Sequence, residues 1–150
     1  MSTLPQFNAE LASWTDRVAL QDGAKMQRDL LTDLLYGVVD GNPVGDPRLW
    51  NPPVAPKGYK GGHSKRNWRV YLHRDYSGGE RPGVDPTGSV VKAEGRAVIA
   101  RITTRPVNFA TIANPVEYMD ALANGWSSQA PAGWIEQTIA RVSARYQRVR

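Results

Sequence analysis

The sequence predicts an α+β fold: a long N-terminal helix, a small antiparallel β-sheet with long Gly/Pro-rich loops, a short helix and a C-terminal helix. Apolar residues recur every three or four positions near both ends of the chain, which is the spacing of amphipathic helices. Between these regions lie short runs of period-two alternation, and short sequential strands favour an antiparallel arrangement. A chain of 150 residues is long enough to bury its own core, so we expect residues 1–150 to form a single structural domain.

Residues 1–38 are expected to form the helical N-terminal part. Thr3 and Gln6 have the spacing of a capping box. A first apolar seam follows, at alternating spacings of three and four: Leu4, Phe7, Leu11, Trp14 and Val18. A second stripe after Gly23 is slightly out of phase with it: Met26, Leu30, Leu31, Leu34, Leu35 and Val38. The pattern predicts two consecutive helices, or one long helix bent near Gly23, ending by Gly37.

Two segments carry too much Gly and Pro for regular structure, because Pro lacks an N–H donor and Gly lacks backbone restraint. Residues 41–62 contain five Gly and five Pro, and residues 76–88 contain six Gly and Pro in thirteen positions. Loops longer than about 12–15 residues are unusual in a compact domain and are often functional. We therefore expect two extended loops that act as arms and reach neighbouring subunits.

Residues 66–150 are expected to hold the sheet and two further helices. Residues 68–73 alternate apolar and polar side chains, which predicts a half-buried strand. Runs at 98–102 and 107–112 predict further strands, joined to each other by a turn at 103–106. The predicted sheet is therefore small and built from short neighbouring strands.

The C-terminal part carries clear signals for two helices. Asn114 is a good N-cap, Pro115 suits a first helical position and Glu117 completes a capping box. This short helix is expected to stop at Asn124 and Gly125, with the glycine in a left-handed C-cap. Pro131 is expected to open the last helix, which has one apolar side: Trp134, Ile135, Thr138, Ile139, Val142 and Tyr146.

Composition excludes several classes of protein. The chain has no Cys, which excludes disulfide frameworks, Cys-based zinc sites and thiol catalysis. No stretch approaches about 18 consecutive apolar residues, so we expect no membrane span and no membrane partner. The N-terminus lacks a basic region followed by an apolar one, so we expect no signal peptide and a protein that stays inside the cell that makes it.

The net charge of +5 is unevenly distributed along the chain. Residues 1–40 carry six acids against three bases, whereas residues 57–74 carry no acid and six bases: Lys57, Lys60, Lys65, Arg66, Arg69 and Arg74. These bases are solvated or face complementary subunits in one interpretation. In the alternative, they bind nucleic acid, because aromatic residues interleave with them and can stack on bases while Lys and Arg neutralise phosphates.

Residues for catalysis are scarce. His63 and His73 are ten positions apart and do not have the spacing of a metal site. The string from Gly62 to Arg66 is not a nucleophile elbow, and no phosphate-binding glycine motif follows a strand. We therefore expect no enzymatic activity, no cofactor and no metal. A hydrolase centred on His63 and Ser64 is a third alternative, beside the two interpretations of the basic segment.

Two segments together resemble a known signature. Ile112-Ala-Asn-Pro-Val-Glu-Tyr118, followed by Leu122 and by Gly125-Trp-Ser-Ser-Gln-Ala-Pro-Ala-Gly133, resembles the C-terminal signature of the neck and tail-completion proteins (minor tail components) of long-tailed bacteriophages. The upstream Gly61-Gly-His-Ser-Lys-Arg-Asn-Trp68 resembles the basic loop of that family, which ends in Asn-Trp and a strand. The resemblance covers about residues 60–145, and residues 125–133 are its most specific part.

The resemblance implies a structural virion protein of the phage head–tail junction, in a ring that joins head to tail and passes DNA. It implies a six-fold homo-oligomer, contacts with other phage neck and tail proteins, and non-specific contact with DNA in the channel. Neck, tail-completion and tail-terminator roles all fit it. The six bases of residues 57–74 are then candidate interface or DNA-facing residues, and five residues form a structural motif: Asn114, Pro115, Gly125, Pro131 and Gly133. The alternative function is a nucleic-acid-binding module that uses the basic segment.

Overall fold

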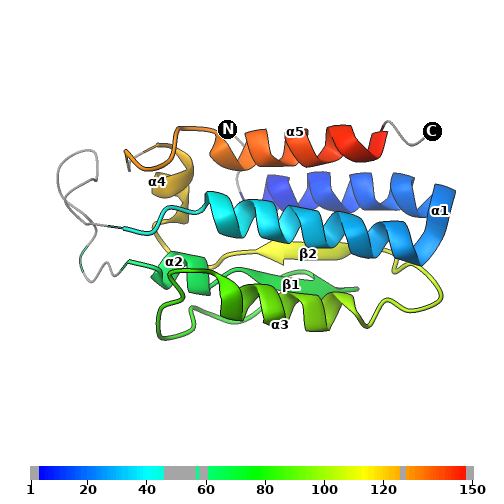
Figure 1. Ribbon diagram of the computed structural model, residues 1–150, viewed down its shortest axis with the longest axis horizontal. Coiled ribbons are helices and arrows are strands. Elements are labelled where there is room, and N and C mark those ends of the chain that lie inside the picture. Colours follow the sequence, from blue (N-terminus) through cyan, green and yellow to red (C-terminus); the bar gives the residue numbers. More distant parts are fainter. Residues whose placement is uncertain (1–3, 46–56, 58–60, 126–127, 148–150) are drawn as a thin grey trace.

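The computed structural model describes the backbone of residues 4–45, 57, 61–125 and 128–147, and side chains within these ranges from residue 23 onward. Its elements follow one another along the chain as α1 (Leu4–Gly41), α2 (His63–Arg66), β1 (Arg69–Leu72), α3 (Ser89–Ile99), β2 (Ala110–Ala113), α4 (Met119–Ala123) and α5 (Trp134–Gln147). Figure 1 shows their arrangement. The fold is α+β, with a small antiparallel sheet between N-terminal and C-terminal helices, which confirms the predicted class.

Helix α1 bends where the sequence predicts it, because Gly23 has φ +74° and ψ −153° inside the helical segment. A positive φ suits glycine and strains other residues. Figure 1 shows the ribbon turning sharply at this point. The helix continues past its predicted end at Gly37. A Cβ on Gly37 would lie 2.6 Å from Thr138 Cγ2, so this glycine allows α5 to approach closely and does not terminate the helix. The capping box at Thr3 lies outside the described residues.

The described sheet has two strands, β1 and β2, which pair antiparallel in a register that sets Arg69 opposite Ala113 and Leu72 opposite Ala110. Strand β1 confirms the prediction for residues 68–73, and β2 overlaps the end of the run at 107–112. The strand predicted at 98–102 is wrong, because this segment is the end of α3 and the turn after it. Its apolar residues belong to a helical face instead, on which Val91, Gly95 and Ile99 are buried at intervals of four.

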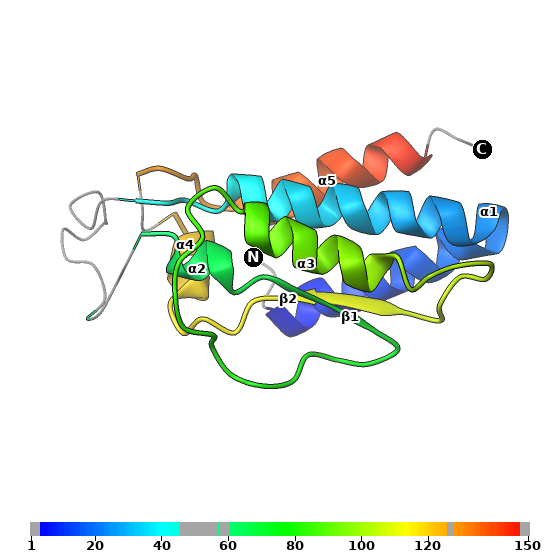
Figure 2. The ribbon, with the colours of Figure 1, turned by 60° about the horizontal axis from the view of Figure 1, so that its bottom comes forward.

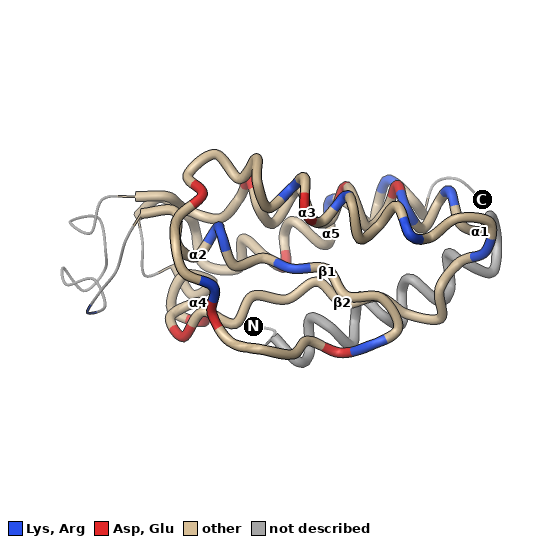
Figure 3. Tube along the Cα trace, turned by 90° about the horizontal axis from the view of Figure 1, so that it is seen from below, with Lys and Arg blue, Asp and Glu red and all other residues tan. Residues whose placement is uncertain are grey.

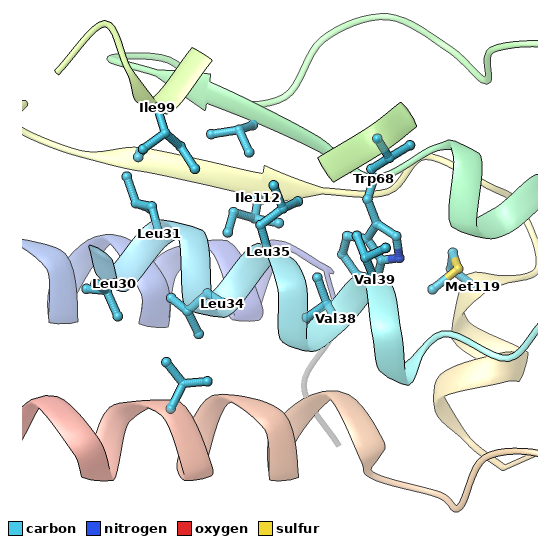
Figure 4. Packing of buried hydrophobic residues seen from close by; sticks show 14 of the residues in the cluster. Leu30, Leu31, Leu34, Leu35, Val38, Val39, Trp68, Ile99, Ile112 and Met119 are labelled. Atoms are coloured by element: carbon cyan, nitrogen blue, oxygen red, sulfur yellow. The ribbon is translucent and has the colours of Figure 1, made fainter. Parts of the chain in front are cut away.

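The second half of α1 lies in the middle of the molecule. Helix α5 packs on one side of it, and the two strands with α3 pack on the other (Figures 1 and 2). Figure 4 shows Leu34 on the side of α1 that faces α5, and Leu31 and Leu35 on the side that faces the strands. All three are buried. Because α1 is covered on two sides, its apolar stripe is broader than that of a surface helix.

A buried side-chain amide connects α1 to the chain before β2. Gln27 is fully buried, and its Nε2 donates to the carbonyl oxygen of Val107 at 2.8 Å. The N–H of Val107 donates back to Gln27 Oε1 at 2.7 Å. The amide therefore takes the place of a paired strand at Val107, whereas β2 begins at Ala110, opposite the last residue of β1.

The capping prediction for the short helix is wrong at its start. Asn114 Oδ1 accepts a hydrogen bond from the N–H of Val116 at 3.1 Å, which closes a turn and does not cap a helix. Helix α4 begins only at Met119 and has no side-chain cap, while the N–H of Glu117 donates to Glu80 Oε1 at 3.0 Å. The last helix likewise begins three residues after Pro131, at Trp134.

In the described ranges, none of the helices has the length and apolar character that crossing a membrane requires.

Candidate functional site

The two segments that carry the sequence resemblance meet in a buried cluster that we call the polar corner: Asn42, Ser64, Trp68 and Asn114. Trp68 Nε1 donates to Asn42 Oδ1 at 2.9 Å, and Asn42 Nδ2 donates to Ser64 Oγ at 2.8 Å. Asn114 Nδ2 donates to the carbonyl oxygen of Ser64 at 2.7 Å. All four residues are at most 2% exposed. The polar corner therefore connects the end of α1, α2 and the chain after β2.

The chain reversal between α4 and α5 packs against the polar corner. The rings of Trp68 and Trp134 lie edge to face with centroids 6.5 Å apart, and Trp134 Nε1 donates to the carbonyl oxygen of Leu122 at 3.1 Å. Gly133 donates its N–H to Ala123 at 2.9 Å. Gly125 has φ +79°, as the sequence predicts, and a Cβ there would lie 2.7 Å from the backbone nitrogen of Ala132.

The predicted structural motif is thus only partly brought together. Asn114, Gly125 and Gly133 hold the corner and the reversal by hydrogen bonds or by left-handed backbone. Pro115 is half-buried, and Pro131 is exposed and only accepts the N–H of Trp134 at 3.3 Å. These residues act on the path of the chain, and none of these contacts forms a site for a ligand.

The basic segment does not form one free surface, which corrects the expectation that all six bases face a partner or DNA. Lys65 is buried at 7% exposure, and burial lowers the pKa of its ammonium group, although Asp40 acts in the opposite direction. Arg66 Nη1 contacts Glu94 Oε2 at 3.0 Å. Lys57 is exposed, and Lys60 lies outside the described residues. Lys65 is therefore not available to a phosphate or to a partner.

The other two bases remain beside β1. Arg69 Nη2 donates to the carbonyl oxygen of Gly79 at 2.6 Å, and the guanidinium of Arg74 lies 5.0 Å from the centroid of the Tyr71 ring. Figure 3 shows basic positions along α2, at the start of β1 and in the loop that follows it. Arg69 and Arg74 thus remain candidate interface residues.

A groove of about 740 Å³ runs along β1 and α3. Residues 68–74 line it without interruption, together with three positions of α3: Glu94, Gly95 and Val98. Four arginines line it as well, from different parts of the chain: Arg69, Arg74, Arg81 and Arg101. We call this feature the arginine groove. The sequence pointed to only two of these four arginines, Arg69 and Arg74. It did not point to Arg81, which belongs to a loop, or to Arg101, which belongs to the segment expected to be a strand.

One acid serves two of the nearby bases. Glu94 Oε2 accepts from Arg81 Nη1 at 2.7 Å and from Arg66 Nη1 at 3.0 Å. Burial by itself raises the pKa of Glu94, but the hydrogen bonds from Arg81 and Arg66 outweigh it and hold the pKa below its usual value. Four guanidinium groups and one carboxylate line the arginine groove, so its positive charge is in excess and it can bind anionic groups.

The pair proposed for a hydrolase is not brought together. The ring of His63 faces the loop after β1, with Nδ1 2.9 Å from the carbonyl oxygen of Gly83 and Nε2 2.9 Å from Glu80 Oε2. Ser64 belongs to the polar corner and is 1% exposed. Within the described ranges, His, Asp and Glu side chains form no group of three that could hold a metal ion.

The loop at 76–88 is held against its own chain, which corrects the expectation of a free arm. Tyr71 Oη donates to the carbonyl oxygen of Ser77 at 2.8 Å, and Asn67 Oδ1 accepts the N–H of Arg81 at 2.6 Å. Asp85 Oδ2 accepts the N–H of Val91 at 2.9 Å. Figure 2 shows this loop sweeping outward from β1 and returning to α3. Most of the loop at 41–62 lies outside the described residues.

Acidic and basic segments that are separate in the sequence also form ion pairs with each other within the chain. Lys92 Nζ contacts Asp40 Oδ1 at 2.5 Å, and Arg145 Nη1 lies 3.9 Å from Asp33 Oδ2. Acids of α1 therefore already face bases of α3 and α5.

Comparison of the chain with protein-family models, with curated proteins and with solved structures finds no match.

Proposed function

We propose that this chain is a structural virion protein of the phage head–tail junction, a neck or tail-completion protein that forms a ring, joins head to tail and passes DNA. The six-fold number, the other phage neck and tail proteins as partners, and the place in the virion follow from the sequence resemblance. The observation that carries the proposal is the polar corner. Its contacts join residues 61–68 to residues 112–133, the two parts of the resemblance.

The resemblance therefore concerns one folded unit. Ser64 lies in the upstream part and Asn114 in the downstream part, fifty residues apart, and they hydrogen-bond in the core. Strands β1 and β2 pair beside these residues, with Arg69 opposite Ala113, so the two matching segments lie together at one end of the sheet. A signature whose residues hold a chain reversal in place is expected of a protein that is selected for its shape.

A structural role is also supported by how the reactive side chains are used. His63, Ser64 and Asn114 each bond to a group that holds the fold. The arginine groove offers donors and charge, which suit binding. A ring of identical subunits needs two different complementary surfaces on each subunit, and a chain with one basic groove can supply one of them.

Particles assembled with and without this protein test the proposal by negative-stain electron microscopy. We expect filled heads and finished tails to be separate when the protein is missing, and joined when the unchanged protein is supplied from a plasmid. A variant changed on the exposed loop, Tyr76→Ala, is the matched control and should restore joining. Joined particles in the absence of the protein would remove the junction function.

Nucleic-acid binding is the second candidate, and Arg74 and Arg101 favour it because both are exposed and line the arginine groove. Binding driven by phosphate contacts weakens steeply as salt rises. Titration of the purified protein with double-stranded DNA at several salt concentrations tests this candidate. No affinity near physiological salt would remove it.

A further inference from the structure

Strand β1 has an edge that no other strand of the described residues covers. The N–H of His73 donates to the carbonyl oxygen of Phe109 at 3.0 Å, and the register with β2 continues from there. Backbone groups alternate in direction along an antiparallel strand, so Val70 and Leu72 point their N–H and C=O groups away from β2. The carbonyl of Trp68 is next in this series, and it accepts from Arg81 Nη2 at 3.5 Å.

The four outward groups of Val70 and Leu72 have no hydrogen-bond partner among the described residues. Val70 is 6% exposed, so its outward groups lie at the bottom of the arginine groove. Buried backbone groups are nearly always paired, and an open strand edge is a template for a further strand. A partner that pairs fully with this edge therefore has to supply two hydrogen-bond donors and two acceptors in alternation.

The groove has room for a strand. Four residues of extended chain occupy a slab about 13 Å long, about 4.8 Å wide and about 10 Å deep, which is on the order of 600 Å³. The groove holds about 740 Å³. Gly95 lines the groove and lets α3 pack closely on α1 and β1, because a Cβ there would lie 2.2 Å from Leu35 Cδ2 and 3.4 Å from Val70 Cγ2.

The two faces of the groove differ in chemistry. Val70 lies on the face of β1 that meets α3, because a Cβ on Gly95 would be 3.4 Å from Val70 Cγ2. Alternation puts Arg69 and Tyr71 on the opposite face, and Arg74 lies over the ring of Tyr71. An added strand would therefore place the apolar side chains of one face toward Gly95 and Val98, with Arg101 at the end of that wall, and the acidic side chains of the other face toward Arg69 and Arg74.

We propose that the free edge of β1 binds an extended, acidic segment of a partner protein by strand addition. Such a segment alternates acidic and apolar side chains, and its backbone supplies the missing donors and acceptors. A nucleic acid fits less well, because phosphate oxygens only accept hydrogen bonds and would leave the carbonyls of Val70 and Leu72 unpaired and facing negative charge. This inference goes beyond the junction function and does not depend on it.

The first test uses the full-length protein and a fluorescent peptide that alternates glutamate and valine. Fluorescence anisotropy should show binding, with backbone N–H groups of Val70 and Leu72 becoming protected from hydrogen exchange in NMR spectra. The same peptide with its central amide nitrogens methylated should bind roughly tenfold more weakly or worse, because it cannot pair with the edge. Equal binding of the two peptides would overturn the proposal.

The second test uses variants matched on one segment. Arg101→Gln changes an arginine that lines the groove, whereas Arg96→Gln changes an exposed arginine of α3 that does not. We expect Arg101→Gln to weaken peptide binding about twofold to fivefold and Arg96→Gln to leave it unchanged. Equal effects of the two changes would overturn the assignment of the groove.

The third test blocks the edge itself. Leu72→Pro removes one outward N–H while leaving the bonds of β1 to β2, so the peptide should no longer bind although β2 stays paired. If this variant does not fold, the exchange protection in the unchanged protein decides the question.

A short oligothymidylate that binds while the peptide does not would overturn the proposal in favour of nucleic acid. Particle morphology plays no part in these measurements, so a failure here is distinct from a failure of the junction function.

Discussion

The polar corner lies at the start of β1 and the arginine groove runs along that strand, and the two differ in how they satisfy polar groups. In the corner, amide, hydroxyl and indole groups combine: the indole N–H of Trp68 and the amide of Asn42 both find acceptors. In the groove, arginines supply only donors, and one carboxylate, Glu94, accepts from two guanidinium groups. Neutral groups that both donate and accept can close a buried network, whereas a cluster of arginines keeps unfilled donors. The corner therefore stabilises the fold, and the groove is left able to bind.

The largest expected effect is in the corner. Trp68→Ala should lower the free energy of unfolding by about 3–5 kcal/mol, because it removes a fully buried ring and leaves Asn42 Oδ1 without its donor. Urea unfolding followed by circular dichroism measures this. The control is Tyr76→Ala, an aromatic residue at 44% exposure, which should change stability by less than about 0.5 kcal/mol. Similar losses in both variants would contradict the closed corner.

The chain reversal beside the corner comes next. Gly125→Ala should cost about 1–3 kcal/mol, because φ is +79° and the new Cβ would lie 2.7 Å from the nitrogen of Ala132. Gly79→Ala is the matched control, since a Cβ there meets no atom within 4 Å. Thermal unfolding of both variants measures the difference. An unchanged melting temperature for Gly125→Ala would show that the reversal tolerates a side chain.

A smaller effect on stability is expected in the groove. Glu94→Gln removes the charge that Arg66 and Arg81 share, and because the Glu94 side chain is 42% exposed the loss should stay below about 1 kcal/mol. The same change frees positive charge, so affinity for the glutamate–valine peptide should rise. Urea unfolding and anisotropy on the same variant measure both effects. A large loss of stability with no gain in affinity would show that Glu94 belongs to the core of the fold.

The smallest effect concerns the loop that borders the groove. A hydrogen bond with His63, and after it the N–H of Glu117, holds the pKa of Glu80 below its usual 4.5. The ionised carboxylate is thus favoured in the folded state, so this attachment contributes above about pH 4.5 and is lost as the pH falls through the folded-state pKa. The protection factor of the Glu117 amide, which corrects for the slower intrinsic exchange in acid, should therefore fall as the pH is lowered.

Two variants separate the causes of that pH dependence. Glu80→Ala should accelerate exchange of the Glu117 amide already at neutral pH, whereas Glu80→Gln keeps an oxygen that can accept this N–H. Global stability should change by less than about 0.5 kcal/mol in both. The attachment would be contradicted by an exchange rate in Glu80→Ala equal to that of the unchanged protein.

Local patterns predicted those parts of the fold that depend on local chemistry. The bend at Gly23 and the left-handed Gly125 follow from the conformational freedom of glycine, and β1 follows from its alternating residues. The run at 98–102 misled because four apolar residues around Arg101 fit either period, and burial against α1 and β1 selected the helix. Gly37 misled because its function is a close approach of α5, which no local signal reveals.

The candidate site shows the same division. Residue type and spacing singled out Arg69 and Arg74 as candidate interface or DNA-facing residues, and both line the groove. The sequence could not identify Arg81 and Arg101 as parts of the same groove, because the fold brings them to β1 from other segments. Nor could it foresee that Lys65 is buried, since the exposed or buried side of a four-residue helix depends on what packs against it.

By itself, the sequence determined the class of the fold, the bend in α1, the position of β1 and the reversal at Gly125, because each depends on the periodicity or the backbone freedom of adjacent residues. The tertiary structure alone decided the number of strands, the pairing of Gln27 with Val107, the polar corner and the free edge within the arginine groove. The physical reason is distance along the chain: these features satisfy or leave open polar groups from residues tens of positions apart, and only packing determines which donor meets which acceptor.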